Sequence, residues 1–173
     1  MAYFQKQSVE TLWSTHKITA VLEEPAAIRQ DIQLLINQKS EDERIFISNS
    51  IPLVMHVPVK DILLLATGLK EKQLKTELAD VFTELELPLA ILQLPLDELS
   101  MLERLKIQLL KSLLLSKKQI ILDDIFESLT IRERQEFLPL LKQLSQNYDL
   151  RFVLLTSDQR IRESHYIDQL LVA

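Results

Sequence analysis

The chain has 173 residues, of which 47% are hydrophobic and 26% are charged, a balance that fits one globular domain and argues against disorder. Its formal charge of −5 gives no electrostatic reason to expect nucleic acid binding, and its zero cysteines exclude disulfides and thiolate metal sites. No apolar run approaches the roughly 18 residues of a membrane span, and no signal-peptide pattern opens the chain, so we expect a cytoplasmic protein without direct membrane insertion.

Glycine is nearly absent, since Gly68 is the only one in the sequence. Loops that cradle phosphates need glycines, because their backbone adopts positive φ and approaches the phosphates closely. A single glycine far from any suitable strand-to-helix junction excludes an ordinary Walker A loop and a dinucleotide-binding fingerprint.

Strand and helix signals alternate from the first third of the chain onward. Residues 17–22 form a short β-branched apolar run that predicts a strand. Pro25 suits the first turn of a helix over residues 26–36, because its missing N–H costs nothing there. A polar loop over 38–43 and a second strand over 44–48 follow.

The middle of the chain is helical in pattern. Residues 57–87 predict two helices broken near Gly68, and residues 87–96 predict an irregular connection marked by prolines and leucines. Ser100 and Glu103 form a capping box, which predicts the start of a helix with leucines at helical spacing after it.

The last third predicts three more strands. Residues 119–122 form one that ends in Asp123 and Asp124, residues 150–156 form a buried one, and residues 167–172 form the last. A second capping box, Thr130 with Glu133, opens a helix that ends near residue 147, and a short helix begins at residues 157–158. Strands separated by helices imply right-handed crossovers and a mainly parallel sheet, which is the α/β class.

The stretch 99–173 resembles the second half of an ABC-transporter ATPase. The sequence LSMLE at 99–103, with Ser100, stands where that family has its LSGGQ signature, and IILDD at 120–124 resembles the Walker B strand with its acids. Residues 128–130 stand at the family's D-loop, Ser157 stands in the place of the switch histidine, and residues 166–172 resemble the closing strand. Ser100 and Asp123 lie 23 positions apart (123 − 100), which resembles the family's spacing.

The first half resembles the family more faintly. Residues 17–31 can be laid without a gap over its first strand, Walker A loop and helix. That alignment implies Arg29 at the lysine position and Gln30 at the magnesium-binding serine, while Asn49 falls near the Q-loop glutamine. The same alignment places Glu23, Ala26 and Ile28 on the three glycines.

Each candidate residue also has a structural interpretation. Asp123 could hold a magnesium-bound water and Asp124 could replace the catalytic glutamate, or the two acids could simply end a buried strand. Ser100, Thr130 and Ser157 are all explained as helix caps. Three histidines share no metal-ligand spacing, so no metal is expected, with Asp123 as the only candidate ligand: His16, His56 and His165.

Two apolar segments, 51–55 and 87–96, could be satellite core or docking surfaces. In the resembled family, the region that corresponds to 51–55 receives the coupling helix of the transmembrane subunit.

The sequence therefore predicts one domain over 1–173 with a P-loop-NTPase-like sheet and a helical insertion over 57–97. The resemblance implies a degenerate ATP-binding subunit without a functional Walker A motif, a pseudo-ATPase for which no cofactor is expected. It would act by binding a membrane permease or an intact ABC ATPase, which would associate it with the membrane through a partner; a homodimer is also left open. Two alternatives remain: an unconventional ATPase that uses ATP and Mg²⁺ in a site completed by a partner, and an unrelated α/β interaction module.

Overall fold

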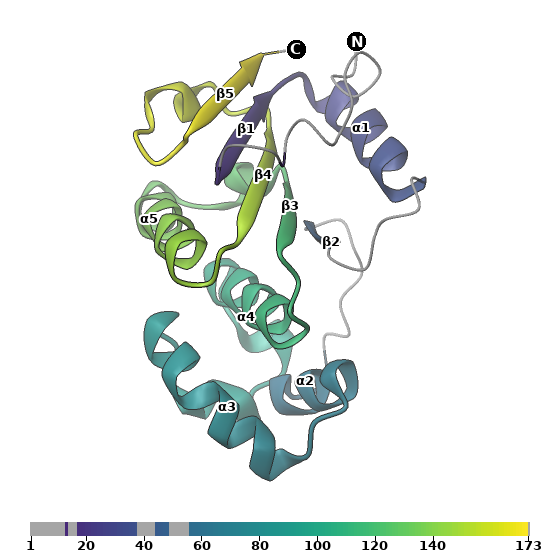
Figure 1. The fold of residues 1–173 in the computed structure, drawn as a ribbon, viewed down its shortest axis with the longest axis vertical. Coiled ribbons are helices and arrows are strands. Elements are labelled where there is room, and N and C mark those ends of the chain that lie inside the picture. Colours follow the sequence, from purple (N-terminus) through teal and green to yellow (C-terminus); the bar gives the residue numbers. More distant parts are fainter. Residues whose placement is uncertain (1–12, 14–16, 38–43, 49–55, 173) are drawn as a thin grey trace. The chain divides into compact units, whose positions relative to one another are not determined.

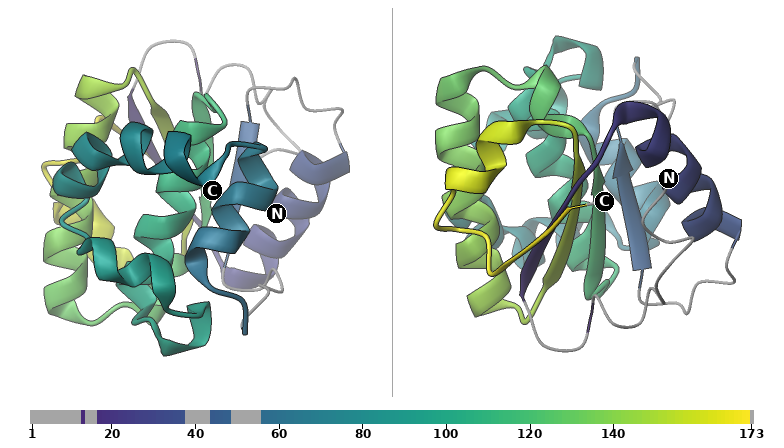
Figure 2. Two further views of the ribbon diagram at one scale, coloured as in Figure 1. Left: turned by 90° about the horizontal axis from the view of Figure 1, so that it is seen from below. Right: turned by 90° about the horizontal axis from the view of Figure 1, so that it is seen from above.

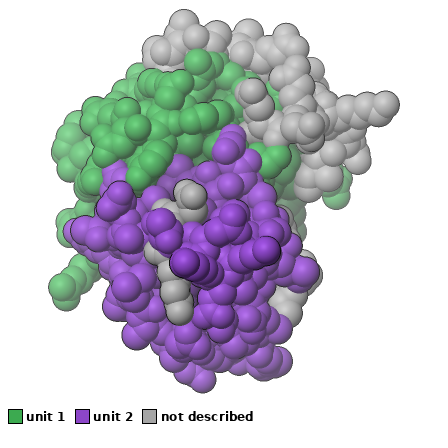
Figure 3. Space-filling view, turned by 60° about the horizontal axis from the view of Figure 1, so that its bottom comes forward, with its two compact units in different colours: residues 1–50, 117–173 green, residues 51–116 purple. Residues whose placement is uncertain are grey.

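The computed structural model describes residue 13 and residues 17–37, 44–48 and 56–172. The chain divides into two compact units, residues 1–50 with 117–173, and residues 51–116 (Figure 3). The helical insertion that the sequence predicts over 57–97 lies inside the second unit, which also takes in the helix that begins after Ser100.

The first unit is built on a five-stranded sheet in which all neighbouring strands are parallel (Figure 1). The strand order is β2-β3-β4-β1-β5. This confirms the predicted α/β fold, and every predicted strand is present. Their bounds are β1 (Ile18–Leu22), β2 (Arg44–Ser48), β3 (Gln119–Asp123), β4 (Arg151–Thr156) and β5 (Gln169–Val172).

Two helices cover opposite faces of this sheet, α1 (Pro25–Asn37) and α5 (Ile131–Asn147) (Figure 2). β1 is buried at all five positions because it lies between two strands and under helices on both faces. The α1 face is sealed by a cluster of buried apolar side chains: Trp13, Val21, Ile28, Leu35, Ile121, Val153 and Leu155.

The second unit is helical, with α2 (Val59–Thr67), α3 (Glu71–Glu84) and α4 (Met101–Leu114). Gly68 ends α2 in the left-handed conformation, with φ of 68°, and its N–H donates to the carbonyl of Leu64 at 2.9 Å. The predicted break between two helices is thus confirmed.

The leucine-rich connection in this unit contains two short 3₁₀ turns, η3 (Leu89–Gln93) and η4 (Leu96–Glu98). Ile91, Leu92 and Leu96 are buried, whereas Leu89 and Leu94 are exposed. The segment is therefore partly satellite core and partly surface.

Both predicted capping boxes are present. At the start of α4 the Glu103 N–H donates to Ser100 Oγ at 3.2 Å, and the Ser100 N–H donates to the Glu103 carboxylate at 2.8 Å. At the start of α5 the Glu133 N–H donates to Thr130 Oγ1 at 3.3 Å, and the Thr130 N–H donates to Glu133 at 2.8 Å. Each box satisfies two N–H groups that a helix start leaves open.

Left-handed backbone is not confined to glycine in this chain. Within the described residues, four other positions have positive φ: Glu86, Ser116, Asp124 and Asp149. L side chains adopt this conformation at a cost of roughly 1–2 kcal/mol, which aspartate tolerates better than most residues.

Candidate functional site

Polar side chains of the first unit gather at one edge of its sheet, where the parallel strands end. The carboxyl ends of parallel strands meet at the same edge, so residues that follow different strands come together there. A cavity of about 450 Å³ lies at this edge. Its polar lining comes from α1, from the ends of β2 and β3, and from the 3₁₀ turn η5 (Ile125–Ser128): Arg29, Gln33, Ser48, Asp123, Asp124, Glu127 and Ser128.

The connection from β1 to α1 beside this cavity is only two residues long, Glu23 and Glu24. Glu23 is 6% exposed, and its N–H donates to the carbonyl of Thr156 at 3.1 Å, which continues the pairing of β1 with β4. The carbonyl of Glu24 accepts the N–H groups of Ala27 at 2.9 Å and Ile28 at 3.1 Å. The connection is thus a tight strand-to-helix corner.

Of the positions that the sequence aligns with the Walker A motif, Glu23 lies in this corner, and Ala26, Ile28, Arg29 and Gln30 lie inside α1. Ile28 is buried in the apolar cluster under the sheet. Arg29 and Gln30 are both exposed on the first turns of the helix, but only Arg29 lines the cavity. The structure therefore brings Arg29 together with Asp123 and Asp124, and leaves Gln30 outside the group.

Asp123 ends β3 and pairs in register with Ser48, the last residue of β2. The buried Ser48 hydroxyl donates a hydrogen bond to Asp123 Oδ2. No sequence motif singles out Ser48; its place as the last residue of a predicted strand is the only signal that the sequence carries for it.

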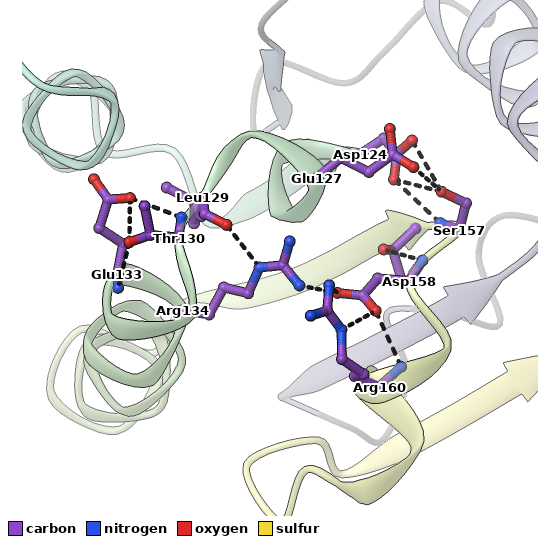
Figure 4. Close-up of polar contacts among 10 residues, drawn as sticks. Asp124, Glu127, Leu129, Thr130, Glu133, Arg134, Ser157, Asp158 and Arg160 are labelled. Carbon is purple, nitrogen blue, oxygen red and sulfur yellow. Dashed lines mark hydrogen bonds and ion pairs between the residues drawn. The ribbon is translucent and has the colours of Figure 1, made fainter.

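Asp124 turns away from the strand in the left-handed conformation, with φ of 41° and ψ of 32°. Its carboxylate accepts a hydrogen bond from the Ser157 N–H at 3.1 Å, and Ser157 Oγ, which has one proton to donate, lies 3.3 Å from this carboxylate and 3.0 Å from that of Glu127 (Figure 4). Burial raises the pKa of Asp124 above its ordinary value; the hydrogen bonds from Ser157 oppose this, and the charges of Glu127 and Asp123 add to it. Ser157 therefore holds two carboxylates close together.

The interpretation of Ser157 as a helix cap is wrong, because the next residue has that role. Asp158 Oδ1 accepts the Arg160 N–H at 3.1 Å and so caps the short helix η6 (Gln159–Glu163). The Asp158 carboxylate also binds the guanidinium groups of Arg134 and Arg160 (Figure 4). The side chain of Ser157 is thus turned to Asp124 and Glu127 rather than to the helix that follows.

Ser100 and Asn49 are the other site candidates from the sequence. Ser100 belongs to the second unit and is occupied by its capping box. Asn49 and the apolar segment 51–55 lie outside the described residues. Among the residues that the structure describes, no three His, Asp or Glu side chains gather in a way that could hold a metal ion.

No family model and no curated protein matches this sequence. Solved structures match its fold. A protein described as a metal-chelate type ABC transporter, in an inward-facing conformation, matches with a TM-score of 0.68 and 19% identity over 82% of this chain and 62% of its own. The protein cbiO1 from Clostridium perfringens, part of the ABC transporter complex cbiONQ, matches with a TM-score of 0.73 and 15% identity over 90% of this chain and 72% of its own. The dimeric bacterial ABC transporter cassette MJ0796 matches with a TM-score of 0.69 and 12% identity over 90% of this chain and 81% of its own.

At these identities the likeness shows the fold, which is the P-loop-NTPase-like fold of ABC transporter ATPase cassettes. The chain spans less than two thirds of the first of these proteins. Along the described residues, no helix has the length and apolar character needed to span a bilayer.

Proposed function

We propose that this chain is a degenerate member of the ABC-cassette family that acts by binding a protein partner and does not hydrolyse ATP. The observation that carries the proposal is the corner between β1 and α1, where two glutamates stand in place of a phosphate-binding loop. A triphosphate needs a row of backbone N–H groups and room for close approach. Here the N–H groups of Ala27 and Ile28 are bonded to the carbonyl of Glu24, and Pro25 has none.

The charge of the cavity points the same way. Asp123, Asp124 and Glu127 line it against one cation, Arg29. With all three acids ionised, these groups carry a formal charge of −2 (one positive and three negative charges). Two like charges about 4 Å apart near a protein surface repel by roughly 4 kcal/mol. A nucleotide triphosphate would meet such repulsion without the lysine that offsets it in a working cassette.

Binding through the helical unit is favoured by its exposed leucines. Leu65 on α2 is 89% exposed and Leu89 on η3 is 60% exposed, and these two elements contact each other. Contiguous exposed apolar side chains mark interaction surfaces, and among the described residues of this unit these two leucines are the most exposed large apolar side chains. A permease or an intact ABC ATPase is the partner that this fold suggests, which would place the chain in the cytoplasm beside a membrane. A homodimer is the other assembly compatible with the fold.

Isothermal titration with Mg-ATP tests the loss of nucleotide binding. We expect no measurable heat up to millimolar nucleotide, while an intact ABC cassette titrated in the same buffer binds. Micromolar affinity for Mg-ATP would refute the proposal.

Affinity purification from native membranes tests the partner. We expect a permease or a second ATPase to copurify with the wild-type chain, and Leu65→Gln with Leu89→Gln to lower the yield. Lys72→Gln is the matched control, because Lys72 is an exposed residue of the same unit with a polar side chain. Equal yields of the partner with all variants would show that these leucines are not part of the interface.

A second candidate function is an unconventional ATPase, because Arg29, Asp123 and Asp124 do line one cavity. In that case a partner would supply the missing phosphate contacts, and ATP with Mg²⁺ would be the cofactors. ATP turnover that appears only with a copurified partner and is abolished by Asp123→Asn would favour it. Turnover that survives Asp123→Asn would assign the activity to the partner alone.

A further inference from the structure

A second cavity of the first unit, of about 360 Å³, lies between the start of α5 and the segment from η6 to Tyr166. Phe126 and Ile161 are buried residues in its lining. α5 lines it with side chains spaced three and four apart, which lie on one helix face: Ile131, Arg134, Gln135 and Leu138. Ile131 is 67% exposed, so a large apolar side chain stands at the cavity with much of its surface in water.

The polar part of the cavity carries two guanidinium groups on one carboxylate (Figure 4). Arg160 Nε and Nη2 donate to Asp158 at 2.8 and 3.0 Å. Arg134 Nη1 donates to the same carboxylate, and its Nε donates to the carbonyl of Leu129 at 2.9 Å. The pKa of Asp158 lies below its ordinary value, because the hydrogen bonds and charges of the two arginines outweigh the opposing effect of burial. Asp158 therefore stays ionised, and the trio carries a net charge of +1.

Both guanidinium groups keep donors for a further acceptor. Arg134 Nη2 and Arg160 Nη1 make no hydrogen bond with any group in the described part of the chain. An arginine has five N–H donors in a planar fork that matches the two oxygens of a carboxylate. A bound carboxylate would thus be held by charge-assisted hydrogen bonds beside an apolar wall.

We propose that this cavity binds a small carboxylic acid with an apolar body. The aliphatic part packs on Ile131, Leu138 and Phe126, and the carboxylate accepts hydrogen bonds from the unused N–H groups of Arg134 and Arg160. The cavity's size falls in the range of small-molecule sites, about 300–1,000 Å³. The site is separate from the cavity at the ends of β2 and β3, with which it shares no lining residue.

One lining group opposes this ligand. Glu163 is exposed and contributes a second negative charge to the lining. Its carboxylate is more exposed to water than that of Asp158 and is more strongly screened. Glu163 also allows a test of the direction of the charge effect, because removal of its negative charge must strengthen binding of an anion.

The experiment is a pair of titrations of the whole chain, one with octanoate and one with octanol, each monitored by amide NMR spectra. The two share an apolar tail and differ in the carboxylate. We expect octanoate to bind at least about fivefold more tightly, with shifts centred on Ile131, Gln135 and Tyr166. No binding of either probe at millimolar concentration overturns the proposal, and so does equal affinity for both.

Single variants assign the contacts. Arg160→Gln removes an exposed cation and abolishes the preference for octanoate, whereas Glu163→Gln strengthens octanoate binding and leaves octanol unchanged. Ile131→Ser weakens both probes. Arg132→Gln is the matched control, since Arg132 is exposed on the same helix and does not line the cavity.

An effect of Arg132→Gln equal to that of Arg160→Gln would overturn the site in favour of general attraction by charge. A peptide with a C-terminal leucine forms a third titration. If it binds while octanoate does not, the occupant is a protein partner and the small-molecule proposal fails.

Discussion

Replacement of Asp158 by asparagine removes the one negative charge that two arginines share. The side chain of Asp158 is 11% exposed and that of Arg134 is 16% exposed, whereas that of Arg160 is 64% exposed. Removal of one partner of a buried ion pair costs about 3–5 kcal/mol, because the other charge stays buried without compensation. Asparagine keeps an oxygen that can cap η6, and Arg134 keeps its bond to Leu129, so we expect about 2–3 kcal/mol. In a chain of this size that corresponds to a fall in Tm of about 5–10 °C.

Urea denaturation of the wild type, Asp158→Asn and Arg160→Gln measures this difference in the free energy of unfolding. Arg160→Gln is the control and should lower the free energy of unfolding by clearly less than Asp158→Asn does, because the group it removes is largely in water. The pKa of Asp158 in the folded chain lies below its ordinary value of 3.8. Its contribution is therefore fully present well above that value and is lost as the pH falls through the folded pKa. The advantage of the wild type should be constant near neutral pH and shrink below about pH 4.

Two results would refute this reasoning. One is a cost for Asp158→Asn no larger than that for Arg160→Gln, which would mean that Arg134 does not depend on the carboxylate. The other is a difference between wild type and Asp158→Asn that stays undiminished at the acid limit of folding.

Three further sets of substitutions test other parts of the fold by urea denaturation. Ser100→Ala and Thr130→Ala should each lower the free energy of unfolding by about 1 kcal/mol through loss of a helix cap. Ser100→Asp should keep most of the stability that Ser100→Ala loses. No loss of stability in either alanine variant would contradict the capping role. Asp124→Asn should be at least as stable as the wild type at neutral pH, because it removes a charge that burial disfavours. Its advantage over the wild type should fade as the pH is lowered toward 3.8. Asp124→Ala lacks an acceptor and fits left-handed backbone poorly, so its free energy of unfolding should instead fall by about 1–2 kcal/mol. Gly68→Ala should lower the free energy of unfolding by about 1 kcal/mol through its φ of 68° alone, since the added Cβ has open space. Ser116→Gly, at φ of 54°, should raise the free energy of unfolding by up to about 1 kcal/mol. A change of the same sign in both variants would exclude backbone strain as the cause.

Much of the fold was predictable because its signals are local. The β-branched run at 18–22 specifies a buried strand, and the serine and threonine capping boxes specify where two helices begin. Gly68 marks a helix end because only its missing Cβ makes the left-handed conformation inexpensive. None of these features depends on which segments meet in space.

The site depends on contacts that no local pattern encodes. Ser48 meets Asp123 because β2 and β3 pair in one particular register, and Ser157 meets Asp124 because β3 and β4 end side by side. The alignment of the β1–α1 region with a Walker A motif also contained a conflict that the sequence could have revealed. Pro25 predicts a helix start at the place where the motif requires a loop, and in the structure α1 begins at Pro25.

The two strand-end aspartates can be understood together with the short corner beside them. Each carboxylate accepts a hydrogen bond from a serine at the end of a neighbouring strand, Ser48 for Asp123 and Ser157 for Asp124. Such bonds give half-buried carboxylates partners within the chain, so this edge of the sheet can be stable without a bound cation or phosphate. If that is their role, Asp123→Asn changes the free energy of unfolding and leaves partner capture intact. A variant that folds with unchanged stability but loses partner-dependent ATP turnover would instead assign Asp123 to catalysis.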